Sequence, residues 1–405
     1  MKTRNLVLIV SLLVLASMLL AACQPAAPAA APVEEAAPAE EAAPAEEATP
    51  AEEGVPTPAD LLAIYPDLPA TLPAHCNIDE VNEGVEFAKT YWVNDLAKSG
   101  DWEPVFRFAP ERYTVGYIEG LGGFPDSVAM TEGFVAAAKL ACVDLVRCDS
   151  KYEVEPAINC AQVMKDAGVD AVMNSNWQAP AMEAMAEILK GIPHVTCDVD
   201  APGVTFFGVD NCFIGTTAGT YMAQWVLDNW DGAVADVWVV NPENPDVGEL
   251  PEKRLSCAEA KIKEMLPDIP ADHYVRIPGG SFTDEGFEAM TTWLTANPDA
   301  KLVLATTIND NGAVGASSAC DSAGRNCVVV GKGASGQAWA ELDKPDAEST
   351  FKASIDFAFF EYARYEIPAL FDLIEGKTIP AVLKNNVYVL DRNNMAEHLA
   401  VRPAE

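Results

Sequence analysis

The sequence predicts an α/β fold in which two doubly wound parallel sheets form separate lobes. Three observations support this prediction. From Arg112 onward, strand-like and helical segments alternate, which is typical of βαβ units and of a parallel sheet. The expected strands are nearly continuous apolar runs, as in strands whose two faces are both covered by helices. The stretch from Arg112 to the end is too long for one core, so two lobes fit it better than one giant sheet.

Residues 1–22 have the features of an export signal. Lys2 and Arg4 supply the positive start, and residues 6–20 supply the apolar middle. The segment closes on the motif LAAC, which ends at Cys23 and resembles the lipobox of bacterial lipoproteins. The resemblance implies that Cys23 carries lipid and holds the protein at a membrane surface without spanning it. An ordinary cleaved signal with an incidental cysteine is the alternative.

Residues 23–58 are a low-complexity linker of Pro, Ala and Glu. Glutamate pairs recur every six residues with prolines between them, and proline at this spacing blocks a long helix. Glutamates also repel one another, so we expect an extended spacer without chemistry. Residues 59–111 show no clear alternation. Trp92 and Trp102 suggest a helical extension packed on the main body.

The remaining elements follow in order, assigned by apolar spacing and by bounding turn residues. In the first half, the expected strands are 113–119, 143–148, 170–174, 193–198 and 204–210. The expected helices between them are 126–142, 155–167 and 179–190. In the second half, the expected order is helix 214–229, strand 235–240, helix 252–265, strand 273–277, helix 284–296, strand 301–307, helix 312–323 and strand 326–331.

Composition and motifs exclude several classes of function. Lys and Arg number 26 against 61 Asp and Glu, and no basic run occurs, so nucleic acid is not an expected partner. Only the N-terminal run is apolar enough to enter a bilayer, which excludes a multi-span membrane protein. The four histidines are scattered and CxxC is absent, so we expect no metal site and no cofactor. No GxSxG, HExxH or P-loop lysine motif occurs, so we expect no enzyme.

Ten cysteines in an exported protein indicate disulfides. With Cys23 lipidated, nine remain, so at least one is unpaired. The near neighbours Cys320/Cys327 and Cys142/Cys148 each flank a helix-to-strand turn. We expect these two pairs first.

The order of motifs after Arg112 resembles the ribose/galactose-type periplasmic binding proteins, the solute receptors of ATP-binding-cassette (ABC) importers. The motifs that carry the resemblance are GGFPDSVAMTEGF, GVDAVMNSN, GIPHVTCDVD, GVDNCFIGTTAGTYMAQWV, LTANPDAKLVLATTINDNGAVGA, VVVGKGASG and EGKTIP. The resemblance implies two lobes joined by three chain crossings, near Asn211, Ser354 and Ala381. The N-terminal lobe is then 112–211 plus 355–381, and the C-terminal lobe is 212–354 plus 382–405.

The resemblance also implies a ligand cleft beyond the carboxyl ends of the strands. Asn174 matches an asparagine that hydrogen-bonds ligand hydroxyls, Asp198 an acid that accepts from them, and Phe282 an aromatic residue that stacks on a sugar ring. Trp177 lies in a loop between polar residues, which favours a ligand contact over packing. The other positions carried over are Phe124, Asp126, Ser127, Arg254 and Asn309.

Three positions depart from the family's pattern and argue against ribose or galactose itself. Val199 stands where the sugar binders have arginine, Lys332 where an acid is usual, and Phe357 where a hinge glutamine is common. We keep Lys332 and Phe357 as expected cleft residues. An aromatic pocket would suit a larger glycoside or a nucleoside, and an acidic sugar would fit if Lys332 and Arg254 both faced the cleft.

Several of these residues have structural alternatives. Asn174 can cap the following helix, Phe282 and Phe357 can be core residues, and Arg254 can pair with Glu252 or Glu259 on its own helix. The glycines of 331–336 satisfy the dinucleotide fingerprint GxGxxG. They lie in a late βαβ unit rather than the first one, so we interpret them as a loop that approaches ligand or backbone closely.

The sequence therefore predicts a monomeric, extracytoplasmic solute receptor that is lipid-anchored to the bacterial cell membrane. We expect it to bind a small carbohydrate between its lobes by hinge closure and to deliver it to an ABC permease. The alternatives are a nucleoside receptor of the same fold, a sensory ligand-binding subunit and an exported hydrolase. The hydrolase lacks support because the sequence supplies no catalytic motif.

Overall fold

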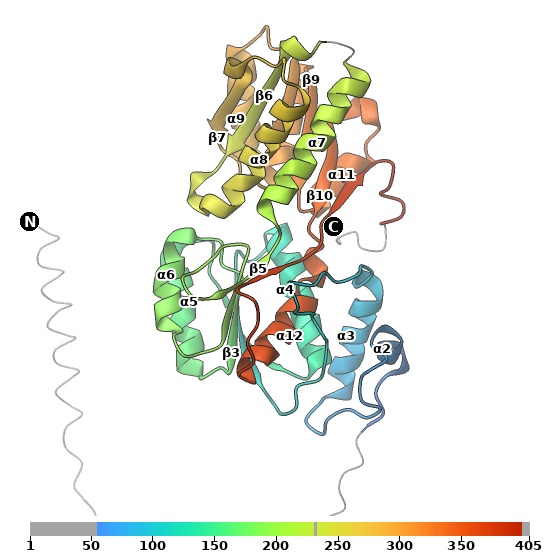
Figure 1. The fold of residues 1–405 in the computed structure, drawn as a ribbon, viewed down its shortest axis with the longest axis vertical. Coiled ribbons are helices and arrows are strands. Elements are labelled where there is room, and N and C mark those ends of the chain that lie inside the picture. The colour runs from blue at the N-terminus through green and yellow to red at the C-terminus, as the bar shows by residue number, and fades with distance from the viewer. Residues whose placement is uncertain (1–54, 231–232, 399–405) are drawn as a thin grey trace, which may run out of the picture. The chain divides into compact units, whose positions relative to one another are not determined.

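The computed structural model describes residues 55–230 and 233–398, which lie in one compact unit. The predicted signal, the predicted lipid-attachment residue Cys23 and most of the predicted linker lie outside the described residues. Two lobes are visible in Figure 1, each built on a six-stranded sheet covered by helices. None of the helices in the described ranges has the length and apolarity that crossing a membrane requires.

The N-terminal lobe is built on a wholly parallel sheet of strand order β11-β5-β4-β3-β1-β2. Its strands are β1 (Thr114–Glu119), β2 (Asp144–Asp149), β3 (Ala171–Asn174), β4 (His194–Cys197), β5 (Thr205–Gly208) and β11 (Val382–Lys384). β3 and β4 are buried throughout, as the apolar runs predict.

Helices cover both faces of this sheet. Tyr117 and Met173 point toward α4 (Pro125–Ala141) and α12 (Ala363–Ile374), while Ile118 and Val172 lie in a second core with α5 (Val154–Ala167) and α6 (Met182–Ile188). The side chains of neighbouring residues in one strand therefore point to opposite faces of the sheet, as the pleat of a strand requires. α12 reaches this lobe from the far end of the sequence.

The C-terminal lobe repeats the design with one antiparallel edge. Its strand order is β12-β10-β9-β8-β6-β7, and β12 runs antiparallel to β10. The strands are β6 (Val237–Glu243), β7 (Tyr274–Pro278), β8 (Leu302–Thr306), β9 (Asn326–Lys332), β10 (Phe351–Asp356) and β12 (Tyr388–Asp391). The helices are α7 (Asn211–Asn229), α8 (Glu249–Met265), α9 (Thr283–Ala296), α10 (Asp310–Ala323) and α11 (Gly336–Asp343).

The chain passes between the lobes three times, and the last two passages differ in place from the prediction. α7 begins at Asn211, where the first crossing was expected. β10 stays in the C-terminal sheet to Asp356, so the second crossing follows Asp356 rather than Ser354. β11 pairs with β5, so the third crossing follows Lys384 rather than Ala381. Only Leu383 of this three-residue strand is buried, which leaves almost no pattern for sequence analysis to detect.

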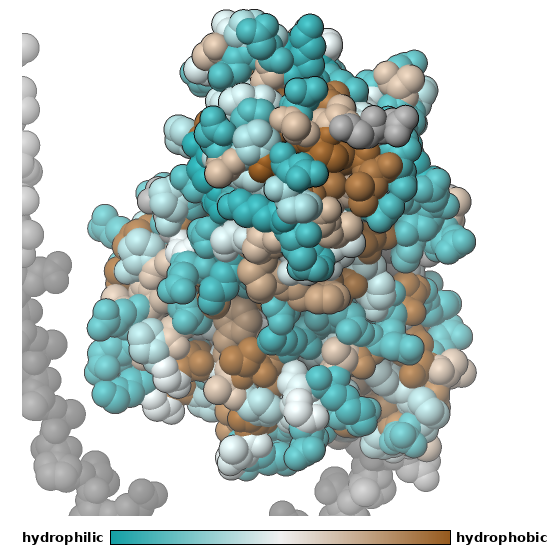
Figure 2. All heavy atoms as spheres, turned by 45° about the horizontal axis from the view of Figure 1, so that its top comes forward, coloured by the Kyte–Doolittle hydropathy of each residue, from teal (hydrophilic) through white to brown (hydrophobic). Residues whose placement is uncertain are grey.

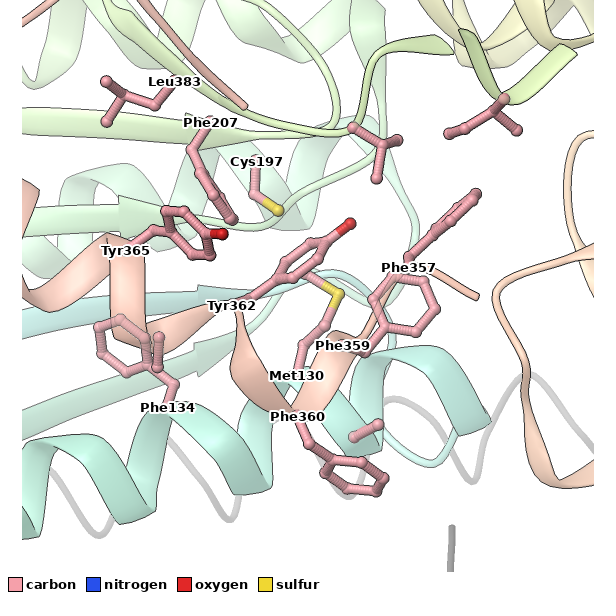
Figure 3. Close-up of a cluster of buried hydrophobic side chains, with 14 of the residues drawn as sticks. Met130, Phe134, Cys197, Phe207, Phe357, Phe359, Phe360, Tyr362, Tyr365 and Leu383 are labelled. Carbon is pink, nitrogen blue, oxygen red and sulfur yellow. The ribbon is translucent and has the colours of Figure 1, made fainter. Parts of the chain in front are cut away.

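The segment before β1 folds onto the N-terminal lobe. It contains α2 (Ala59–Ile64) and α3 (Ile78–Tyr91), and α3 packs against α4. Trp92 donates from its indole nitrogen to the carbonyl of Phe360, at 3.0 Å. Phe360 belongs to the single turn η6 (Phe359–Glu361) of the second crossing, which lies above α4 in Figure 3. The extension therefore touches the hinge directly.

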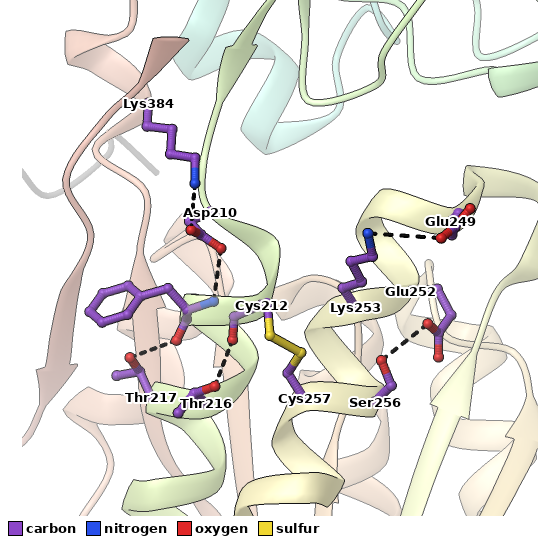
Figure 4. The surroundings of a disulfide bond; sticks show 11 residues. Asp210, Cys212, Thr216, Thr217, Glu249, Glu252, Lys253, Ser256, Cys257 and Lys384 are labelled. Atoms are coloured by element: carbon purple, nitrogen blue, oxygen red, sulfur yellow. Dashed lines mark hydrogen bonds and ion pairs between the residues drawn. A yellow bond between two sulfur atoms is a disulfide. The ribbon is translucent and has the colours of Figure 1, made fainter. Parts of the chain in front are cut away.

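Four disulfides join the described residues, and they correct one of the two predicted pairs. Cys320–Cys327 is confirmed, but Cys142–Cys148 is wrong. Cys142 ends α4 in a left-handed conformation and bonds to Cys76 of the extension, while Cys148 bonds to Cys160 of α5. Short spacing did not decide the partner, because Cys142 and Cys148 lie at opposite ends of β2. Cys212–Cys257 joins α7 to α8 (Figure 4), and Cys197 is free and buried.

Candidate ligand-binding site

A cavity lies between the two lobes, beyond the carboxyl ends of strands from both sheets. Its free volume is about 70 Å³, whereas a single water needs roughly 10–15 Å³. The N-terminal lobe, the second crossing and the C-terminal lobe all contribute to the walls. The lining residues are Leu121, Phe124, Asp126, Tyr152, Trp177, Asp198, Val199, Val247, Pro251, Arg254, Ser281, Phe282, Ile308, Asn309 and Phe359.

Most of the residues expected in the cleft are brought together here. They come from segments far apart in the sequence: most lie after a strand or at a helix start, whereas Arg254 lies within α8. The expected residues that line the cavity are Phe124, Asp126, Trp177, Asp198, Arg254, Phe282 and Asn309.

Aromatic rings from both lobes meet across the cavity. Phe124 is the N-cap residue of α4, and Phe282 is the N-cap residue of α9 in the other lobe. Their ring centroids are 5.9 Å apart in an edge-to-face arrangement. Phe124 also contacts Trp177 at 5.9 Å, and Phe282 contacts Tyr152 at 5.8 Å. This row of rings forms the apolar part of the cavity wall.

Arg254 is held at the cavity wall by several partners. Its Nε donates to Asn211 Oδ1 at 2.6 Å, and one terminal nitrogen donates to the carbonyl of Ile308 at 2.8 Å. The guanidinium lies 4.8 Å from the centre of the Phe357 ring. The predicted alternative pairing with Glu252 or Glu259 is wrong, because both of those carboxylates contact Arg276 instead.

Asp198 faces Arg254 from the opposite lobe. Its Oδ1 lies 3.9 Å from Arg254 Nη2 and accepts from the backbone N–H of Val209 at 3.4 Å. Tyr362 donates its hydroxyl to Oδ2, also at 3.4 Å. Burial raises the pKa of Asp198, and the charge of Arg254 opposes that rise. Gly208 is required beside it, because a Cβ there would lie 2.5 Å from Asp198 Oδ1.

Asn309 and Ser281 line the cavity but already have protein partners. Asn309 caps α10 by accepting from the N–H of Gly312 at 3.1 Å, and its amide donates to the carbonyl of Ser281 at 2.9 Å. The hydroxyl of Ser281 accepts from the side chain of Asn244 at 2.6 Å. These groups fix the shape of the C-terminal wall.

Four expected cleft residues do not line the cavity. Ser127 Oγ accepts from the N–H of Leu121 and so holds the first loop. Asn174 neither caps a helix nor reaches the cavity; its Oδ1 accepts from the N–H of Asn176 at 3.1 Å. Lys332 is fully buried and donates to the Thr306 hydroxyl and to the Thr307 carbonyl. Phe357 lies beneath Arg254.

The position of Lys332 removes the condition for an acidic sugar. That expectation required Lys332 and Arg254 to face the cleft together, and only Arg254 does. Burial lowers the pKa of Lys332 well below its usual value, with the charge of Arg254 acting in the same direction. A strand end facing a cleft and a strand end facing the core have the same sequence pattern, so the sequence alone could not distinguish them.

Several lining residues were not predicted. Ser281 and Ile308 directly precede predicted residues, so the same strand-end loops contained the signal for them. Tyr152 has a positive φ of 56° in the turn after β2, and Phe359 lies in the second crossing. Val247 lies in the turn before α8, and Pro251 lies in the first turn of α8. No local pattern marks a residue that reaches the cavity from a turn.

The family model described as periplasmic binding protein domain matches residues 120–378. A search of curated proteins found no match. The solved structures that resemble this chain include an ABC transporter periplasmic solute binding protein from Actinobacillus succinogenes 130z with bound D-allose. It is 20% identical, with a TM-score of 0.60, over 70% of this chain and 99% of that chain.

Two further solved structures agree with this comparison. An ABC transporter solute binding protein from Mycobacterium smegmatis with bound glycerol is 21% identical, with a TM-score of 0.63, over 73% of this chain and all of that chain (100%). The Caulobacter myo-inositol binding protein bound to myo-inositol is 20% identical, with a TM-score of 0.59, over 72% of this chain and 97% of that chain. At this identity the likeness establishes a shared fold.

Proposed function

Because this chain belongs to the periplasmic binding protein domain family, we propose that it is the extracytoplasmic substrate-binding protein of an ABC importer. We propose that its substrate is a small carbohydrate bound between the lobes. The observation that carries this proposal is the interlobe cavity, where two carboxylates and a row of aromatic rings converge from both lobes.

The chemistry of the cavity suits a polyhydroxylated molecule. Carboxylates such as Asp126 and Asp198 accept hydrogen bonds from hydroxyls, and aromatic faces such as Trp177 cover the C–H side of a sugar ring. The resembling proteins named above hold D-allose, glycerol and myo-inositol, all of which are polyols.

Closure of the lobes around the ligand supplies selectivity. Phe124 and Phe282 meet from opposite lobes, as do Asp198 and Arg254. When such a site closes, water is removed and each buried polar group needs a partner on the ligand. A molecule that lacks the matching hydroxyl leaves a polar group unpaired and binds less tightly.

The remaining parts of the proposal rest on the sequence. The export signal, the motif that ends at Cys23 and the Pro/Ala/Glu linker support a lipid anchor on the outer side of the cell membrane. Delivery to a permease follows from the role of solute receptors in ABC importers. Loss of metabolic palmitate labelling in a Cys23→Ala variant is the expected result for the anchor, and undiminished labelling would contradict it.

A thermal-shift panel tests the ligand class. Pentoses, hexoses, disaccharides, sugar acids and nucleosides are compared at concentrations high enough to saturate a specific site. A ligand at one hundred times its dissociation constant stabilises the folded state by about 2.7 kcal/mol. We expect a shift with at least one sugar, and no shift with any sugar would contradict the proposal.

A nucleoside receptor is the second candidate, and the row of aromatic rings is the observation that favours it. Phe124, Trp177, Phe282 and Tyr152 could cover a base as well as a sugar ring. A shift with inosine or adenosine and with none of the sugars would support this candidate over the carbohydrate.

A further inference from the structure

We propose that the ligand is an amino polyol, such as a hexosamine, whose protonated amine lies against Asp126. This inference rests on the proposed function, because it uses the same interlobe cavity and names the class of carbohydrate. Neutral sugars need only hydroxyl partners, whereas this cavity presents a buried carboxylate with an unused acceptor oxygen.

Asp126 is the polar residue of the cavity that lacks a partner. Its side chain is only 4% exposed, and its Oδ1 has no hydrogen-bond partner among the described residues. It lies in the first turn of α4 and lines the cavity directly. A buried acceptor without a donor is costly, so a ligand that donates to Asp126 gains more than one that does not.

Four other polar residues of the cavity already have protein partners. Asn309 and Ser281 bond within the C-terminal wall. Asp198 and Arg254 face each other across the lobes, and Arg254 also donates to Asn211 and Ile308. The charge of Arg254 also acts on Asp126, but it offsets only part of the rise in the pKa of Asp126.

A second, smaller cavity adjoins Asp126. Asp126 and Phe359 line both cavities, and the small one is also lined by Ser335 and Asp356. Its free volume of about 20 Å³ accommodates one group the size of a water, which is also the size of an ammonium head. Within the described ranges, no lysine or arginine lines this small cavity.

Carboxylates from both lobes converge on this place. A Cβ at Gly333 would lie 3.4 Å from Asp310 Oδ2 and 3.7 Å from Asp126 Oδ2, so the two acids flank the same glycine. Burial and the nearby charge of Asp310 raise the pKa of Asp126 well above its usual value. A ligand ammonium group between the lobes relieves this repulsion, and a neutral hydroxyl relieves less of it.

The aromatic residues support a cation as well as a sugar ring. Phe359 lies at the junction of the two cavities, and the rings of Phe124 and Trp177 line the larger one. The face of an aromatic ring attracts an ammonium group through its quadrupole. Lys332, the buried amine nearby, donates to Thr306 and Thr307 and does not line either cavity.

Calorimetric titration with matched sugars tests the inference. The full chain, purified in mild detergent, is titrated with glucose, glucosamine and N-acetylglucosamine, and with the corresponding galactose and mannose series. The pH is one at which the amine is protonated. We expect at least one amine to bind tenfold or more tightly than its neutral and acetylated partners.

The Asp126→Asn variant assigns the preference to one residue. Asparagine keeps the shape of the side chain and removes its charge, so the amine should lose its advantage and bind within about threefold of the neutral sugar. Asp166→Asn, the same change on the exposed surface of α5, should retain the full preference. Thermal unfolding without ligand verifies that both variants are folded.

The outcomes separate this inference from the proposed function. Tight binding of neutral or acetylated sugars, with no advantage for the amine, overturns the inference and leaves the carbohydrate function standing. An amine preference that survives Asp126→Asn also overturns it. Absence of binding by every member of the three series overturns the inference, and the carbohydrate function is then decided by the wider thermal-shift panel.

Discussion

At the residue scale, Asp198 places one carboxylate at the meeting of the two lobes, where we propose that a ligand binds. It has a positive φ of 59°, which turns its side chain from the end of β4 toward the cavity. The hydrogen bonds that it accepts from Val209 and Tyr362 are both long, at 3.4 Å, and the thiol of Cys197 donates to its Oδ2 at 3.8 Å. Long bonds leave acceptor capacity that a ligand hydroxyl can use.

Replacement of Asp198 by alanine should therefore abolish the ligand response. We expect the affinity for the responding sugar to fall at least tenfold, because an acceptor on the ligand-facing wall is lost. The thermal-shift assay measures this change, and unfolding without ligand confirms that the variant is folded. Asp166→Asn serves as the surface control. Unchanged affinity in Asp198→Ala would show that the cavity is not the binding site.

Asp356, at the start of the second crossing, gives the protein a pH-dependent stability. Burial raises its pKa to about 7, while the N–H of Ala358, which donates to Oδ1 at 2.7 Å, opposes the rise. Because the folded state holds this proton more tightly than the unfolded chain does, stability falls as pH rises from about 4 to about 7. Asp310, whose pKa burial raises to about 6, acts in the same direction.

An Asp356→Asn variant should lose part of this pH dependence. Asparagine can still accept from Ala358 and carries no charge, so we expect higher stability than the native chain at about pH 8. The gain should be on the order of 1 kcal/mol or more, because one pKa unit corresponds to about 1.4 kcal/mol. Scanning calorimetry at about pH 5 and about pH 8 measures it. Equal slopes in the two proteins would rule out this role.

At the element scale, α4 and the turn η6 approach each other closely. A Cβ at Gly133 of α4 would lie 2.7 Å from the carbonyl oxygen of Phe360, so only glycine permits this contact. Phe360 in turn stacks on Tyr91 of the extension, with centroids 4.3 Å apart. Glu361 accepts from the N–H groups of Val93 and Asn94. The extension, α4 and the second crossing thus form one packed unit.

Gly133→Ala should destabilise the protein, although alanine is the better helix former. The added methyl group would displace η6, at a cost of about 1–3 kcal/mol that exceeds the helix-propensity gain of about 1 kcal/mol. Gly336→Ala at the start of α11 is the matched control, because nothing lies within 4 Å of its added Cβ. Chemical denaturation compares the two. Equal stability of both variants would contradict the close approach.

At the scale of the whole molecule, side chains of the two lobes touch across the ligand cavity. Phe282 is the C-terminal-lobe residue that contacts aromatic rings of the N-terminal lobe, namely Phe124 and Tyr152. Lys384 of β11 pairs with Asp210, just before α7, at 2.6 Å (Figure 4). Hydrophilic side chains predominate on the face shown in Figure 2, in keeping with the formal charge of −35.

Phe282→Ala should weaken ligand binding by opening the row of rings between the lobes. We expect a loss of tenfold or more in affinity, because edge-to-face contacts and buried apolar area are lost together. Phe213→Ala removes an exposed phenylalanine of α7 and should leave affinity unchanged. Small-angle scattering adds a second readout, since ligand should compact the native chain more than the Phe282→Ala variant. Equal compaction of the native chain and the variant on ligand addition would show that Phe282 does not contribute to lobe closure.

The sequence alone determined the class of the fold and many of its elements. Apolar runs and helical spacing are local properties, so the helix expected at 126–142 is α4 and the helix expected at 284–296 is α9. The family's motifs indicated which strand-end loops supply the cavity. Short spacing predicted the disulfide Cys320–Cys327 correctly, but the same reasoning failed for Cys142 and Cys148.

Tertiary structure decided what depends on residues far apart in sequence. Cys142 bonds to Cys76, which is 66 residues away, because the extension folds onto the N-terminal lobe. Asp126 and Lys332 both stand at the edges of regular elements, yet only Asp126 lines the cavity. Local pattern determines that a side chain is buried, whereas the packing of distant segments determines whether it faces a core or a ligand.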